Sequence, residues 1–286
     1  MSSNAGYYVP HGTNWPILLT IGLFIMVFGV ADVLNGYGAG ILLWGGLALV
    51  LVIVFLWFRS VVTESQGGLY NAQVDRTFRL GMGWFIFSEV MFFGAFFGAL
   101  FYARVLSNAW LGGAGDGGMT HLVLWPGYDA IWPTNGPADM GGPFQPMGPW
   151  GLPAINTLIL LTSGVTVTYA HHALRKNHRR GLIGGLLATV VLGFLFVYLQ
   201  AVEYQEAYHH LNLTLESGVY GSTFFMLTGF HGMHVTLGAI MLTVVLLRAV
   251  AGHFTADNHF AFEAAAWYWH FVDVVWLGLF VFVYWL

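Results

Sequence analysis

Long apolar stretches separated by short polar segments make up most of this chain. An α-helix needs about 20 apolar residues to cross the ~30 Å hydrocarbon core of a bilayer. Seven stretches approach or exceed that length, at residues 15–34, 41–58, 80–102, 155–174, 182–204, 222–250 and 262–286. The pattern predicts an all-α, polytopic membrane protein with seven transmembrane helices, in which residues 1–286 form a single transmembrane domain.

The connections between these stretches differ in length. Residues 35–40 are too few to hold a domain, so we expect the first two helices to form a tight hairpin. Residues 59–79 form a polar connection, and residues 103–154 form a long loop rich in Gly, Pro and Trp. Loops this long are uncommon and usually serve a function or bind a partner.

Lys and Arg are distributed unevenly over the connections. If the N-terminus lies inside, every Lys and Arg of the chain except Arg104 falls in an inside segment. Cytoplasmic loops carry an excess of these residues, so we predict an inside N-terminus and an outside C-terminus. The connection before the sixth span fits this orientation, because it carries Glu203, Glu206 and Glu216 without a cation.

The amino-acid composition further limits the class of protein and the kinds of site that the chain can contain. Only 8% of the residues are charged, against about 25% in soluble domains. The absence of cysteine excludes disulfides, thiolate metal sites, iron–sulfur clusters and CxxCH haem attachment. The net charge of −4 and the lack of a basic patch argue against nucleic acid as a partner. The N-terminal residues lack a charged region and a cleavage site, so we expect the first span to be kept as an anchor.

The third span contains one charged residue, Glu89. At the helical rise of ~1.5 Å per residue it lies about 16 Å from Phe78, near the bilayer midplane. An ionisable side chain at that depth costs roughly 2.5–3.5 kcal/mol on insertion scales and marks a candidate functional site.

Two other spans place polar groups at a similar depth. His231 and His234 of the sixth span are three residues apart and share a helix face. His270 and Asp273 lie on one stripe of the seventh span. Buried carboxyl and imidazole groups need hydrogen-bond partners. We therefore predict a mid-membrane polar network of Glu89, His231, His234, His270 and Asp273, with Glu89, His234 and Asp273 meeting in one layer.

Four interpretations of this network remain open from the residues alone. It can be a structural hydrogen-bond network, a proton relay, a set of haem or metal ligands, or part of a substrate or ion pathway in a transporter. Glu206 and His209 match half of a di-iron motif, but no second copy lies at a matching depth. The sequence signal for a metal site is therefore weak, and we name no residue of this chain as a metal ligand.

Two further patterns bear on packing and lipid. Gly94 and Gly98 form a GxxxG pair, which lets another helix approach closely. Basic and amphipathic side chains lie near the inner ends of the second and sixth spans, where an anionic lipid headgroup can bind; ordinary positive-inside anchoring is the alternative. These candidate lipid-binding residues are Trp57, Arg59, Glu64, Arg248 and His253.

Four segments carry a resemblance to a known family. They are FIFSEVMFFGAFF (85–97), INTLILLTSGVTVTYAHHAL (155–174), YGSTFFMLTGFHGMHV (220–235) and FEAAAWYWHFVDVVW (262–276). The chain resembles subunit III of cytochrome c oxidase, of the haem–copper oxidase superfamily and of the proteobacterial and mitochondrial type. The last segment is long and unusual, which makes the match specific.

The resemblance implies a non-catalytic core subunit of a proton-pumping oxidase. Haem and copper would lie in subunits I and II, this chain would pack against subunit I, and cytochrome c would be a substrate of the complex. A two-helix bundle (15–58) and a five-helix bundle (80–286) would enclose a V-shaped cleft that holds phospholipid. The family's proposed roles are support of proton uptake, protection against turnover-linked inactivation, and access of dioxygen. The implied location is a bacterial inner membrane, with a mitochondrial inner membrane as the alternative.

The resemblance also implies roles for single residues. Glu89 matches the carbodiimide-reactive carboxyl of the family, and His234 matches the histidine near it. The candidate lipid-binding residues named above match positions that line the family's lipid sites. Gly98, Ala251 and Thr63 depart from the family pattern, where Trp or cationic residues are common.

Three alternatives to this interpretation are kept. A related subunit of a quinol oxidase is the nearest, although the complete 262–276 segment favours the cytochrome c branch. A secondary transporter and a membrane redox enzyme with its own metal are the others. On the inner surface, five histidines can relay protons laterally or can be solvated loop residues. They are His171, His172, His178, His253 and His259.

Overall fold

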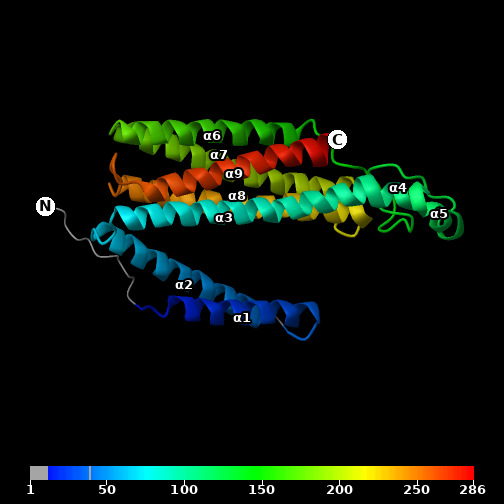
Figure 1. Ribbon diagram of the computed structural model, residues 1–286, viewed down its shortest axis with the longest axis horizontal. Helices are drawn as coiled ribbons and strands as arrows, with labels where there is room; N and C mark the ends of the chain where they lie inside the picture. Colours follow the sequence, from blue (N-terminus) through cyan, green and yellow to red (C-terminus); the bar gives the residue numbers. More distant parts are fainter. Residues whose placement is uncertain (1–11, 39) are drawn as a thin grey trace. The chain divides into compact units, whose positions relative to one another are not determined.

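The computed structural model describes residues 12–38 and 40–286, and this part of the chain is helical without any strand (Figure 1). The prediction of an all-α protein is confirmed, and seven helical segments are long and apolar enough to cross a membrane. A membrane favours helices because their backbone N–H and C=O groups are paired within the segment. The elements are α1 Trp15–Leu34, α2 Ile41–Gln66, α3 Ala72–Phe101, the π-helix Tyr102–Ser107, α4 Asn108–Leu111, the 3₁₀ turn Gly115–Gly117, α5 Gly118–Leu124, α6 Leu152–Arg175, α7 Arg179–His210, α8 Gly218–Val250, α9 Phe260–Leu279 and the π-helix Phe280–Trp285.

Several helices run beyond their apolar stretches. α2 continues to Gln66 and α3 begins at Ala72, so most of the predicted polar connection 59–79 is helical. Residues 102–111 continue α3 through a π-helical turn, and α5 lies inside the predicted loop 103–154. Arg, Glu and Gln are good helix formers, so the end of an apolar run does not by itself end a helix.

The chain divides into two compact units, residues 1–80 and 81–286, and α3 belongs partly to each. In the first unit α1 packs against α2, as the short connection predicts. A Cβ atom added at Gly29 would lie 2.2 Å from the backbone nitrogen of Leu43, and one added at Gly46 would lie 2.5 Å from that of Met26. These glycines therefore permit the close approach of the two backbones, as small residues do in membrane helix pairs.

In the second unit four helices form a closed ring. α6 contacts α7, α7 contacts α8, α8 contacts α9, and α9 contacts α6. The indole of Trp269 on α9 is fully buried, and its Nε1–H donates to Ser163 Oγ at 2.8 Å. Gly193 of α7 and Gly238 of α8 make room for that ring, because a Cβ on either would come within 2.8 Å of it.

α3 joins this ring in a different way, through large aromatic side chains. Phe92 lies 5.1 Å from Phe230 of α8 between ring centroids, and Phe93 lies 6.0 Å from Phe271 of α9. The predicted close helix approach at Gly94 and Gly98 is wrong for the described part of the chain, since nothing there lies within 4 Å of an added Cβ. The phenylalanine rings keep the α3 backbone away from α8 and α9.

Candidate functional site

Glu89 and His234 form a hydrogen-bonded pair between α3 and α8. Glu89 Oε2 lies 2.9 Å from His234 Nε2. The side chain of His234 is buried and that of Glu89 is largely buried. Two members of the predicted polar network therefore contact each other directly, in an otherwise aromatic seam.

The second nitrogen of His234 fixes the proton count of the pair. Nδ1 lies 2.6 Å from the carbonyl oxygen of Phe230, and a carbonyl can only accept. Nδ1 therefore carries a hydrogen, and the bond to Glu89 contains one further proton. Either a neutral Glu89 carboxyl donates to a neutral imidazole, or an imidazolium donates to a carboxylate. Both arrangements have zero net charge, which lowers the cost of burying the pair.

Aromatic rings surround the imidazole of His234. The ring centroids of Phe93, Phe92 and Tyr268 lie 5.0, 5.8 and 6.3 Å from its own. These contacts come from α3 and α9, so the imidazole is held from two sides. Both ring nitrogens of His234 therefore find their partners within this chain, inside a shell of aromatic rings.

His270 and Asp273 form a second carboxyl–imidazole pair on α9, facing α6. His270 Nδ1 lies 3.5 Å from Asp273 Oδ2, and His270 Nε2 lies 3.3 Å from Thr168 Oγ1. Gly164 makes room for the carboxyl, because a Cβ there would lie 2.5 Å from Asp273 Oδ2. Asp273 Oδ1 is buried without a hydrogen-bond partner among the described residues, whereas the His270 side chain is 46% exposed.

His231 is fully buried in the ring of helices. Its Nε2–H donates to the carbonyl of Val272 at 3.1 Å, and its ring lies 5.1 Å from that of Trp276 and 5.6 Å from that of Phe196. Its Nδ1 has no partner within the described ranges. These contacts make His231 a packed core residue that ties α8 to α9.

The predicted single layer of Glu89, His234 and Asp273 is not formed by direct contacts. Asp273 faces α6, where it lies beside Gly164, whereas His234 faces α3. The reason is that α9 packs against both α6 and α8, and His270 and Asp273 lie on the side of α9 that faces α6. Glu89 with His234 and His270 with Asp273 therefore form two separate pairs.

The candidate lipid-binding residues lie in both units. In the first unit, Glu64 accepts a hydrogen bond from Tyr70 Oη at 2.8 Å, Trp57 is half-buried and Arg59 is exposed. In the second unit, the Arg248 guanidinium lies 4.7 Å from the ring centroid of Phe254. Its Nε is buried without a hydrogen-bond partner in the part of the chain that the structure describes. His253, five residues further on, is half-buried.

The structure also shows a buried carboxyl that the sequence analysis misplaced. Glu203 was assigned to an outside connection, but it lies within α7 and is fully buried. Tyr284 Oη donates to Glu203 Oε1 at 2.6 Å, and Oε2 has no partner among the described side chains. The position of Glu203 inside the apolar stretch 182–204 already indicated that it lies in a span.

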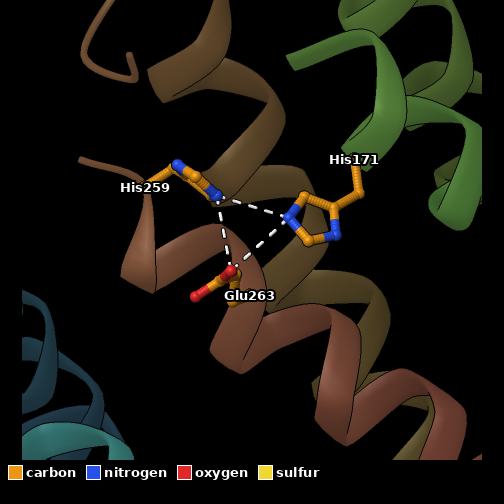
Figure 2. A group of neighbouring side chains, drawn as sticks. All are labelled: His171, His259 and Glu263. Atoms are coloured by element: carbon orange, nitrogen blue, oxygen red, sulfur yellow. Dashed lines mark hydrogen bonds and ion pairs between the residues drawn. The ribbon is translucent and has the colours of Figure 1, made fainter. Parts of the chain in front are cut away.

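A second missed group lies where α6 ends and α9 begins. Figure 2 shows the rings of His171 and His259 and the carboxyl of Glu263 pointing toward one another. The two Nε2 atoms are 3.3 Å apart, and Glu263 Oε1 lies 3.5 Å from His171 Nε2 and 3.4 Å from His259 Nε2. The sequence signal was the four-residue spacing of His259 and Glu263, which places both on one helix face.

Comparisons with known proteins agree with these features. The family model for cytochrome c oxidase subunit III matches residues 6–286. The chain is 40% identical over 280 residues to cytochrome c oxidase subunit 3 of Tetraodon nigroviridis, covering 98% of this chain and 96% of the relative. It is 40% identical over 287 residues to the subunit of Marchantia polymorpha, covering 100% and 98%. The chain belongs to the cytochrome c oxidase subunit III family.

Proposed function

We propose that this chain is an accessory, non-catalytic subunit of a proton-pumping cytochrome c oxidase. In this proposal it packs against subunit I, binds structural phospholipid, sustains proton uptake and protects the complex during turnover. The haem and copper centres belong to subunits I and II, and cytochrome c is a substrate of the complex rather than a ligand of this chain.

The observation that supports this proposal most strongly is the hydrogen bonding of the buried histidines. Both ring nitrogens of His234 are engaged, one by Glu89 and one by Phe230. One nitrogen of His231 is engaged by Val272. Ligation of a haem iron or copper by His234 would require one of its bonds to break and would leave a buried polar atom unpaired. Its present contacts suit a packing role.

The face of α6 and α9 that carries Thr168 and His270 supports binding to another subunit. His270 lies about 15 Å along α9 from its first residue, at membrane depth, and its side chain is 46% exposed. Polar groups at that depth almost always face protein or a water-filled cavity rather than lipid tails. A helix of subunit I that packs over His270 would cover this face and keep lipid tails away from it.

The proposed lipid contacts draw on the ends of α2 and α8. The unpartnered Nε of Arg248 is a donor for a headgroup phosphate, and Phe254 holds the guanidinium in place. Arg59 and Trp57 offer a cation and an interfacial ring at the end of the apolar part of α2. We place these ends, with the N-terminus, on the cytoplasmic side, and we favour a bacterial inner membrane.

The electron donor follows from the matched family. Its model and its relatives are named for cytochrome c oxidase, which favours cytochrome c over quinol. Assaying the purified complex with each donor separates the two. Rapid oxygen uptake with a quinol and none with cytochrome c would overturn this part of the proposal.

Removal of the chain from the purified complex tests the accessory role. We expect the remaining subunits to keep their haem and their initial rate of oxygen reduction near neutral pH. We expect slower proton uptake as the pH is raised, and fewer turnovers before inactivation. Complete loss of oxygen reduction with the haem still bound would mean a direct catalytic role. Unchanged proton uptake and an unchanged number of turnovers before inactivation would mean that the chain serves only as a scaffold.

A further inference from the structure

We propose that His171, His259 and Glu263 form a binding site for one divalent transition-metal ion, with Zn²⁺ as the best match (Figure 2). The site joins the last turns of α6 to the first turn of α9. This inference does not depend on the proposed function, because it concerns a separate group of side chains.

The geometry of the three donor atoms fits tetrahedral coordination. Zinc binds imidazole nitrogen and carboxylate oxygen at about 2.0–2.2 Å, so neighbouring ligands of a tetrahedron lie about 3.3–3.5 Å apart. The three atoms are separated by 3.3, 3.4 and 3.5 Å. A single ion can therefore bind all three atoms without a rearrangement of the helices. Two imidazoles and one carboxylate also form a donor set that zinc uses.

His259 is oriented for ligation by its second nitrogen. Its Nδ1 lies 3.0 Å from the carbonyl oxygen of Thr255, so Nδ1 carries the hydrogen and the neutral ring presents a lone pair at Nε2. The turn that contains Thr255 is stabilised by Asn258, whose backbone N–H donates to Thr255 Oγ1 at 3.1 Å. Metal-bound histidines commonly donate their other ring hydrogen to a carbonyl in this way.

His171 meets two acceptors at one nitrogen. Its Nε2 faces the lone pair of His259 Nε2 and the carboxyl oxygen of Glu263. Its ring lies 5.3 Å from that of Phe262, a fully buried residue, which limits its rotation. Without an ion, a hydrogen on His171 Nε2 must lie between these acceptors. A divalent cation would take the place of that hydrogen while His171 carries its proton on Nδ1.

The three side chains of the site are mostly buried but not fully enclosed. The side chains of His259, Glu263 and His171 are 9%, 17% and 30% exposed. No fourth His, Cys, Asp or Glu joins the group among the residues that the structure describes. A bound ion would therefore keep a coordination position for water or a small anion, and would link α6 to α9 at their adjoining ends.

Metal titration of the purified oxidase complex that contains this chain tests the proposal. The complex is stripped with a mild chelator and dialysed against Zn²⁺, and the zinc bound per haem is compared between variants. We expect His171→Asn and Glu263→Gln each to weaken one micromolar-range site by about 100-fold or more, as the loss of a ligand should exceed the 10–100-fold effect of a lost supporting contact. His172→Asn is the matched control, because the neighbouring His172 is exposed and outside the group, and we expect it to bind like the parent.

Haem content and co-purification of the subunits show whether each variant assembles. X-ray absorption at the zinc edge should show two imidazoles and oxygen ligands at about 2.0–2.2 Å, and this signal should be lost in Glu263→Gln and kept in His172→Asn. Assembled His171→Asn and Glu263→Gln complexes that bind zinc like the parent would overturn the proposal. So would zinc binding that requires millimolar concentrations in the parent.

Discussion

The carboxyl–imidazole pairs Glu89–His234 and His270–Asp273 both lie near mid-membrane depth, and they differ in how fully they are hydrogen-bonded. In the first, Glu89 and His234 are 2.9 Å apart, and the second nitrogen of His234 is bound to a backbone carbonyl. In the second, His270 and Asp273 are 3.5 Å apart, and one carboxyl oxygen of Asp273 has no partner among the described residues. The first pair is surrounded by rings, whereas His270 is nearly half exposed.

The difference suggests two uses of the same chemistry. The Glu89–His234 pair engages both ring nitrogens of the histidine within the chain, which lowers the cost of burying it, and it links α3 to α8. A pair whose imidazole is nearly half exposed is stable at membrane depth only when protein or water outside the chain covers it. The first pair therefore holds this chain together, and we expect the second to hold the chain to its neighbour.

Breaking the first pair should have the largest effect. Glu89→Leu leaves His234 Nε2 buried without its partner, which should lower the free energy of unfolding by about 3 kcal/mol, since breaking a buried pair costs ~3–5 kcal/mol and Glu89 is not fully buried. Denaturant titration of the separated chain in detergent, with its tryptophan fluorescence as the signal, measures the change. A loss of under about 0.5 kcal/mol would show that the pair contributes little, because even one unsatisfied buried group costs ~1–3 kcal/mol.

The second pair should respond to assembly rather than to folding. His270→Phe removes the exposed imidazole but leaves an apolar ring that lipid tolerates. We expect about tenfold weaker retention of the chain by the other subunits, or ~1.4 kcal/mol, with the unfolding of the separated chain changed by less than about 0.5 kcal/mol, as for most surface substitutions. Tyr198→Phe on α7 is the control, because Tyr198 is 65% exposed and α7 carries no member of either pair. Equal effects on folding and retention would remove the distinction between the pairs.

Replacing both members of the first pair should have the smallest effect. Glu89→Leu combined with His234→Phe removes the two polar partners together and leaves apolar groups in an aromatic seam. Such replacements of a whole buried pair are often neutral, so we expect the double variant to recover all but about 1 kcal/mol of the loss in Glu89→Leu. A double variant that unfolds as readily as the single one would mean that Glu89 acts on something other than His234.

The sequence predicted the parts of the fold that depend on local pattern. Apolar length identified all seven spans, and the depth of the few polar groups placed Glu89 and His234 in one network. Helix ends were missed because Arg59 and Glu64 continue α2 beyond its apolar part. Membership of the subunit III family also removes the secondary-transporter alternative.

Contacts between distant segments were the part that local pattern could not supply. His171 and His259 are 88 residues apart, and they meet only because α6 packs against α9. Asp273 was expected beside Glu89 because position along a span indicates only depth in the membrane. The rotation of α9 about its axis decides which neighbouring helix a residue faces, and local pattern does not show that rotation. The hydrogen bond between Tyr284 and Glu203, which are 81 residues apart, is another contact of this kind.

The most direct test asks what covers the second pair in the intact complex. Val274 adjoins Asp273 and is 68% exposed, and the chain has no cysteine, so Val274→Cys provides a single thiol in this chain for a benzophenone cross-linker. After illumination of the purified complex in lipid, mass spectrometry identifies what is attached. The account predicts a cross-link to a transmembrane helix of another oxidase subunit. Attachment to lipid alone would contradict it.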